Sequence, residues 1–82
     1  MGLFTWLFGS SNRDGSSAEK AIIVRDVAEE YAWMSRHCSG FHHVMQALQF
    51  IAEKPYDVHT LRSDSGTERT VYFDISSFFG KF

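Results

Sequence analysis

The sequence of 82 residues predicts one small α+β domain: a short strand, one helix and then a three-stranded antiparallel meander, with the helix packed on one face of the sheet. Three observations favour this class. With 44% hydrophobic and 22% charged residues, the composition is that of a chain with a packed core. One segment repeats its apolar residues at helical spacing, and turn-forming residues divide the second half into strand-length segments.

The N-terminal residues are expected to lie outside this domain, which then spans residues 18–82. Residues 1–9 are apolar, but they lack the basic start of a signal peptide and are too few to cross a membrane. Residues 10–17 are mostly small and polar, as in a flexible linker. The apolar segment is expected to dock on the domain or on a partner, and insertion of residues 3–8 into a membrane surface is the alternative.

A strand and a helix open the predicted domain. Residues 21–24 are Ala-Ile-Ile-Val, and β-branched residues of this kind are typical of a strand. Residues 26–38 repeat their apolar residues every three or four positions, which indicates a helix. The same region also fits one longer helix that starts at Ser17, and this alternative stays open.

The predicted helix has end signals and one residue out of place. Asp26 can cap its N terminus, with Glu29 completing a capping box, and Gly40 can end it in the left-handed conformation. At about 100° per residue, Trp33 falls opposite the apolar stripe and is expected to point away from the sheet. The stripe that should face the sheet consists of Val27, Tyr31, Met34 and Cys38.

The second half is predicted to form three antiparallel strands. Between the last two strands, the sequence Ser-Asp-Ser-Gly at residues 63–66 is a turn signal. A turn there places Arg62 opposite Thr67 and Val58 opposite Val71. The paired apolar residues then share one face of the sheet, which is the arrangement that a half-buried sheet requires.

A second turn, around residues 53–55, is expected to place Ala52 opposite Tyr56. Together the two hairpins predict that one face of the sheet packs against the helix. That face consists of Val44, Leu48, Phe50, Tyr56, Val58, Val71, Phe73 and Ile75. A helical stripe also fits residues 41–52, so a helix remains the alternative for the first strand of the meander.

Charge and cysteine content narrow the class of function. The eight basic residues are spread singly and the net charge is −2, so nucleic acid is not an expected partner. The single cysteine, Cys38, fits a reducing compartment, and a cytoplasmic location is expected. The sequence contains neither a phosphate-binding loop nor a hydrolase motif. No cofactor is therefore predicted, and an enzyme is the less favoured class.

Side chains that can bind zinc gather near the C-terminal end of the predicted helix. They are His37, Cys38, His42 and His43. Their spacing is not that of a paired zinc motif, and adjacent histidines in an extended strand point to opposite faces. No metal site is predicted here. Cys38 is not expected to act as a nucleophile either, because the negative end of a helix disfavours its thiolate.

A polar group is predicted on the sheet face away from the helix. It consists of Asp57, His59, Tyr72 and Asp74. A carboxylate, an imidazole and a phenol on one surface have the chemistry for acid–base work. A small enzyme or ligand-binding domain that uses this face is the alternative function.

The favoured prediction of function is based on aromatic residues. Trp33 and the aromatic residues of the two chain ends are candidates for contacts with a partner, because interfaces are rich in such side chains. The end residues are Phe4, Trp6, Phe8, Phe78, Phe79 and Phe82. The sequence thus predicts a non-catalytic protein-interaction or assembly module that binds a protein partner or a second copy of itself, with a peripheral membrane adaptor as the second alternative.

Overall fold

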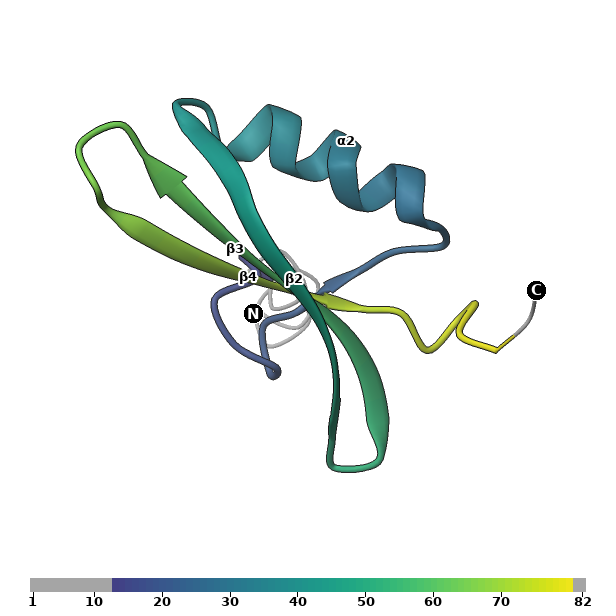
Figure 1. The fold of residues 1–82 in the computed structure, drawn as a ribbon. Coiled ribbons are helices and arrows are strands. Elements are labelled where there is room, and N and C mark those ends of the chain that lie inside the picture. The colour runs from purple at the N-terminus through teal and green to yellow at the C-terminus, as the bar shows by residue number, and fades with distance from the viewer. Residues whose placement is uncertain (1–12, 81–82) are drawn as a thin grey trace, which may run out of the picture.

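The computed structural model describes residues 13–80, and its elements follow the predicted order (Figure 1). They are β1 (Ile22–Ile23), α2 (Val27–His37), β2 (Phe41–Ile51), β3 (Lys54–Ser63) and β4 (Glu68–Asp74). The four strands form one sheet in the order β1-β4-β3-β2, and α2 packs on one face of it. The predicted α+β class is confirmed.

Some predictions concern residues outside the described part of the chain. They involve the apolar segment 1–9, with Phe4, Trp6 and Phe8, the first residues of the expected linker, and Phe82. Among residues 13–80, no helix is long and apolar enough to span a membrane.

β1 is a short parallel strand at one edge of the sheet. Its two residues, Ile22 and Ile23, lie opposite Phe73 and Asp74 of β4. The strand expected in this region is therefore present, and the alternative of one long helix from Ser17 is wrong.

The chain on either side of β1 is bonded to β4. The Gly15 carbonyl accepts the Tyr72 N–H at 2.7 Å, and the Val24 N–H donates to the Asp74 carbonyl at 3.3 Å. Gly15 lies within the expected linker, yet it is buried, and its φ is +79°. A Cβ at this position would lie 2.7 Å from Cγ1 of Val71. This close approach requires glycine.

Asp26 caps the N terminus of α2 as predicted, but Glu29 bonds to the backbone N–H of Arg25 rather than to that of Asp26, one residue away from the predicted capping box. The Asp26 side chain accepts the Glu29 N–H at 2.9 Å, and the Glu29 carboxylate accepts the Arg25 N–H at 2.6 Å. At the other end the Cys38 N–H donates to the Met34 carbonyl, and the chain then turns at a glycine with φ +85°. Both ends depend on local hydrogen bonds, which is why the sequence predicts them.

α2 is rotated relative to the predicted orientation. Its buried residues are Glu30 and Met34, whereas Val27 and Tyr31 of the predicted stripe are about half exposed. Trp33 packs against the core instead of pointing away from the sheet. The helix wheel was therefore wrong by roughly 70°, because the helix turns inward a carboxylate, a residue type that the wheel assigns to the surface.

β2 is a strand, so the helical alternative for residues 41–52 is wrong. Its hairpin with β3 closes more tightly than expected, with Ile51 opposite Lys54 and a two-residue turn of Ala52 and Glu53. Both turn residues have positive φ, 51° and 67°. The predicted pairing of Ala52 with Tyr56 is incorrect for this reason.

The β3–β4 register differs from the predicted one by one residue. Arg62 lies opposite Glu68, not Thr67, and Val58 lies opposite Tyr72, not Val71. A slip of one residue moves every side chain of one strand to the other face. The predicted helix-facing set therefore mixes the two faces of the sheet.

Both faces of the sheet bury apolar residues. Toward α2, the core consists of Val24, Met34, Cys38, Leu61, Val71, Phe73 and Ile75. On the opposite face, Tyr56 and Val58 pack with Ala21 of the N-terminal segment. The remaining members of the predicted core, in β2, are largely exposed: Val44, Leu48 and Phe50.

Candidate functional site

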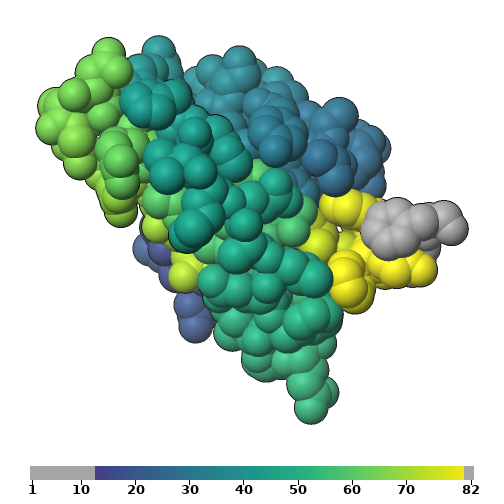
Figure 2. All heavy atoms as spheres, in the orientation of Figure 1, coloured from purple at the N-terminus to yellow at the C-terminus, as the bar shows by residue number. Residues whose placement is uncertain are grey.

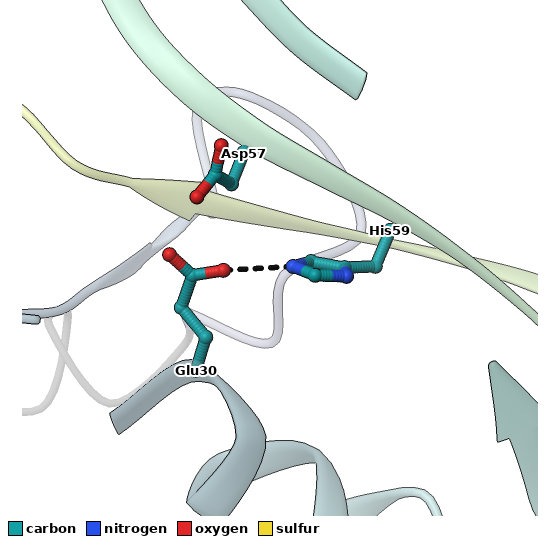
Figure 3. Close-up of side chains that lie close together, drawn as sticks. All are labelled: Glu30, Asp57 and His59. Atoms are coloured by element: carbon teal, nitrogen blue, oxygen red, sulfur yellow. Dashed lines mark hydrogen bonds and ion pairs between the residues drawn. The ribbon is translucent and has the colours of Figure 1, made fainter. Parts of the chain in front are cut away.

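Three ionisable side chains are buried together between α2 and the sheet (Figure 3). Glu30 projects from α2, and Asp57 and His59 are two positions apart in β3, so both point toward the helix. One potential ligand atom from each of the three lies within 4.8 Å of the other two. Glu30 and His59 are 0% exposed and Asp57 is 8% exposed.

Hydrogen bonds connect this cluster to the protein surface. Oε1 of Glu30 lies 2.7 Å from Nε2 of His59, and Nδ1 of His59 lies 2.8 Å from Nε2 of His43 on β2. His43 borders an open groove of about 340 Å³ between the end of α2 and β2. The buried carboxyl group is thus two hydrogen bonds away from an exposed imidazole.

Aromatic rings hold His59 in place. The rings of Tyr31 and Phe73 lie edge-on to its imidazole, with centroid distances of 5.6 Å and 5.4 Å. His59 has no exposed surface, so its ring cannot turn without disturbing these contacts.

Burial favours the uncharged forms of Glu30 and His59. Burial first, and then a hydrogen bond to the Asp57 carboxylate and its negative charge, raise the pKa of Glu30 to about 9. Burial lowers the pKa of His59, although Asp57 opposes this shift, and it lowers the pKa of His43 as well. At neutral pH, Glu30 is therefore protonated and both imidazoles are neutral.

One oxygen atom of the cluster lacks a partner. Oε2 of Glu30 is buried and accepts no hydrogen bond from the described residues, and in Figure 3 the carboxyl group turns this oxygen toward Asp57. Among residues 13–80, no lysine or arginine forms an ion pair with Glu30 or Asp57. Two acidic side chains therefore lie together without a cationic lysine or arginine partner.

The second candidate region is the outer edge of β2. This strand has 11 residues, and within residues 13–80 no other strand pairs with one of its sides. Met45, Leu48 and Phe50 are 57%, 50% and 59% exposed. Figure 2 shows the atoms of β2, in teal, on the face of the molecule toward the viewer, where no other described element covers them.

The structure divides the predicted polar face. Asp57 and His59 face the helix, whereas Tyr72 and Asp74 lie opposite Val58 and Tyr56 on the other face. Asp74 forms an ion pair with Lys54 at 2.9 Å. The prediction that all four share one solvated face is wrong because of the register slip.

Glu30 is the residue that sequence reasoning missed. The one sequence signal for it is its position on the helix, one turn before Met34, on the side that becomes buried. Hydrophobicity assigns a glutamate there to solvent, and nothing local shows that a histidine of β3 lies opposite it.

The predicted zinc-type residues do not converge. His37 stacks on Trp33 with ring centroids 4.5 Å apart, and Cys38 is buried, which raises the pKa of its thiol. His42 and His43 are adjacent in an extended strand and point to opposite faces, and His43 bonds to His59.

The aromatic residues that can be located pack on the core. The ring of Trp33 lies edge-on to Phe73 at 5.8 Å, with the Arg69 guanidinium 5.9 Å from its centroid. Phe78 and Phe79 pack against the same core, and Phe79 also contacts Phe50. Trp33 is therefore not the unsupported surface residue that the helix wheel predicted.

Comparison of the chain with protein-family models, with curated proteins and with solved structures found no match. A functional assignment therefore has to come from the geometry of these residues.

Proposed function

We propose that this protein is an interaction module that self-associates by pairing its β2 strand with the β2 strand of a second copy. The observation that carries the proposal is an edge strand of 11 residues that contains no Asp, Glu, Lys or Arg. The sequence Phe-His-His-Val-Met-Gln-Ala-Leu-Gln-Phe-Ile is apolar or neutral throughout when its histidines are neutral.

Exposed edge strands normally carry features that prevent pairing with another chain. Charged side chains, proline, short length and bulges all serve this purpose. β2 has one irregularity in its pairing, between His43 and Met45, but residues 45–51 pair regularly with β3, and no described strand pairs with their outer side. β1, at the other edge, is only 2 residues long. The unprotected edge is therefore β2.

A second copy fits this edge better than a charged partner does. Twofold pairing places the same strand on both sides, so a neutral strand meets no like charge and its apolar side chains meet apolar side chains. Antiparallel pairing of residues 45–51 brings Leu48, the middle residue, close to the twofold axis. Phe50 of each copy adds apolar area beside it.

The proposal is tested by placing a lysine at the centre of β2. Light scattering of the full chain is expected to give a dimer. Leu48→Lys is expected to give a monomer with an unchanged circular dichroism spectrum, because it opposes two positive charges near the axis and the native Leu48 is half exposed.

Ile23→Lys is the matched control, since Ile23 is an equally exposed apolar residue on the opposite edge strand. This variant is expected to remain a dimer. A wild type that stays monomeric up to millimolar concentration would contradict the proposal. A dimer that survives Leu48→Lys but is lost in Ile23→Lys would place the interface at the other edge.

A further inference from the structure

We infer that Glu30, Asp57 and His59 form a binding site for one divalent transition-metal cation of the zinc type. The self-association proposed above does not require this site, so the two proposals can fail separately. The inference rests on the arrangement of three ligand atoms, on an oxygen without a partner and on the charge of the surroundings.

The geometry is close to that of a three-ligand site. Two carboxyl groups and one imidazole present atoms within 4.8 Å of one another, and they come from α2 and β3, elements that the core holds against each other. The 2.7 Å contact between Glu30 and His59 would need to open to about 3.3 Å for a tetrahedral ion with metal–ligand distances of about 2.0 Å. An ion there replaces the proton between them.

The unpartnered oxygen points to a ligand at this place. Oε2 of Glu30 is buried and lacks a hydrogen-bond donor among the described residues, although its carboxyl group lies beside Asp57. Two buried carboxyl groups side by side are costly unless a shared proton or a cation lies between them. A cation between Glu30 and Asp57 gives this oxygen a partner and supplies the positive charge that the described ion pairs do not.

His43 completes the arrangement without touching the ion. When the His59 Nδ1–H donates to Nε2 of His43 at 2.8 Å, the lone pair of His59 Nε2 points toward Glu30 and Asp57. Metal-binding histidines commonly use the other ring nitrogen in this way, which fixes the tautomer and the ring orientation. His43 is therefore a positioning residue for His59.

The ligand set favours one class of ion. Magnesium and calcium prefer oxygen ligands and several water molecules. A mixed set of one imidazole nitrogen and two carboxylates suits zinc and its neighbours in the first transition series. Three protein ligands leave the fourth position of a tetrahedral ion to water.

The untagged full chain is first treated with a chelator to remove bound metal. It is then titrated with cobalt(II) and afterwards with zinc(II). Cobalt(II) is expected to bind with a stoichiometry of one and to give the visible absorption of a tetrahedral site, without the near-ultraviolet band of sulfur ligation. Zinc is expected to displace it and to raise the melting temperature, because it binds only the folded state.

Two variants remove a ligand with little change in shape. Glu30→Gln and Asp57→Asn are each expected to weaken metal binding by at least about 100-fold. His43→Ala, which removes only the partner of His59, is expected to weaken it by about tenfold. Glu29→Gln and His42→Ala are the matched controls on the same elements, and both should bind like the wild type because Glu29 bonds to Arg25 and His42 is exposed, so neither side chain belongs to the three-ligand cluster.

X-ray absorption of the wild-type zinc complex tests the site without a variant. It should show oxygen and nitrogen ligands with a single imidazole. Two or more imidazoles, a sulfur ligand, equal binding by Glu30→Gln, or no binding at all would each overturn the inference. Loss of binding in His42→Ala would place the ion at the surface histidines instead.

Discussion

Glu30 is the residue on which the interior of this protein most depends. It is fully buried, it bonds to a fully buried histidine, and its inward position sets the rotation of α2. Removing one partner of such a neutral pair costs about 1–3 kcal/mol, because the other is left buried without a hydrogen bond. An amide at this position keeps the size of the side chain and a hydrogen bond to His59, and it removes only the ability to ionise.

The pKa of Glu30 predicts how stability changes with pH. In the folded protein the pKa is raised to about 9, so between about pH 4.5 and 9 the folded state holds a proton that the unfolded state has lost. This stabilisation is complete below the unfolded pKa and disappears as the pH rises through the folded one. The wild type should therefore lose stability relative to Glu30→Gln by up to about 1.4 kcal/mol per pH unit in this window.

Urea unfolding of both proteins at pH 5, 7 and 9, in the presence of a chelator, measures this difference. Glu29→Gln is the control: Arg25 lowers the pKa of Glu29, so this exposed group stays ionised in both states across the same range. If the stability of the wild type relative to Glu30→Gln stayed constant or rose with pH, Glu30 would be ionised in the folded protein.

Part of the candidate site was visible in the sequence at this scale. Asp57 and His59 were identified together because residues two apart in a strand share a face, and that relation is local. Glu30 and His43 were not identified as their partners. They come from other elements, and only the packing of those elements brings them together.

At the scale of elements, the turns explain why the strands were found but not their pairing. Hairpin turns with two left-handed residues usually contain Asn or Gly, whereas Ala52 and Glu53 give no such signal. The apolar pattern did not correct the error, since Leu61 is buried on one face of β3 and Val58 on the other. Either register therefore pairs apolar residues.

The same turn offers a test. Glu53 has φ 67°, a conformation that costs a residue with a Cβ about 1–2 kcal/mol. Glu53→Gly is therefore expected to stabilise the protein by about 1 kcal/mol in urea unfolding, after the greater flexibility of glycine in the unfolded chain is included.

Gly66→Ala is the reciprocal control, because Gly66 has φ +90° in the β3–β4 turn and a Cβ there would meet nothing within 4 Å. It is expected to destabilise by about 1 kcal/mol for the conformational reason alone. If Glu53→Gly lowered stability, the left-handed turn at Ala52 and Glu53 would be contradicted.

At the scale of the whole molecule, the sheet is protected unequally. One face is covered by α2, and the other is partly covered by the segment that leads into β1, with Ala21 against Tyr56 and Val58. Class, element order and helix ends were predictable because they follow from local pattern. The covering of the second face was not, because the contact of Ala21 with Tyr56 and Val58 depends on tertiary packing that no local pattern shows.

The attachment of β1 to β4 also predicts an order of folding. The two hairpins join neighbouring strands, whereas Ile22 and Phe73, which lie opposite each other, are about 50 residues apart in the chain. Closing that long loop costs more entropy than closing a hairpin. The β2–β3–β4 meander should therefore form in the folding transition state, and β1 should join after it.

Gly15→Ala probes this last step, because the added Cβ disturbs the contact with Val71 on β4. In stopped-flow measurements the variant is expected to unfold faster than the wild type and to fold at nearly the same rate. A folding rate that fell by the whole loss of stability would instead place β1 in the nucleus. Late docking leaves β4 as an edge strand until folding is complete, so for a short time each chain exposes an unpaired edge of 7 residues where the folded sheet has the 2 residues of β1.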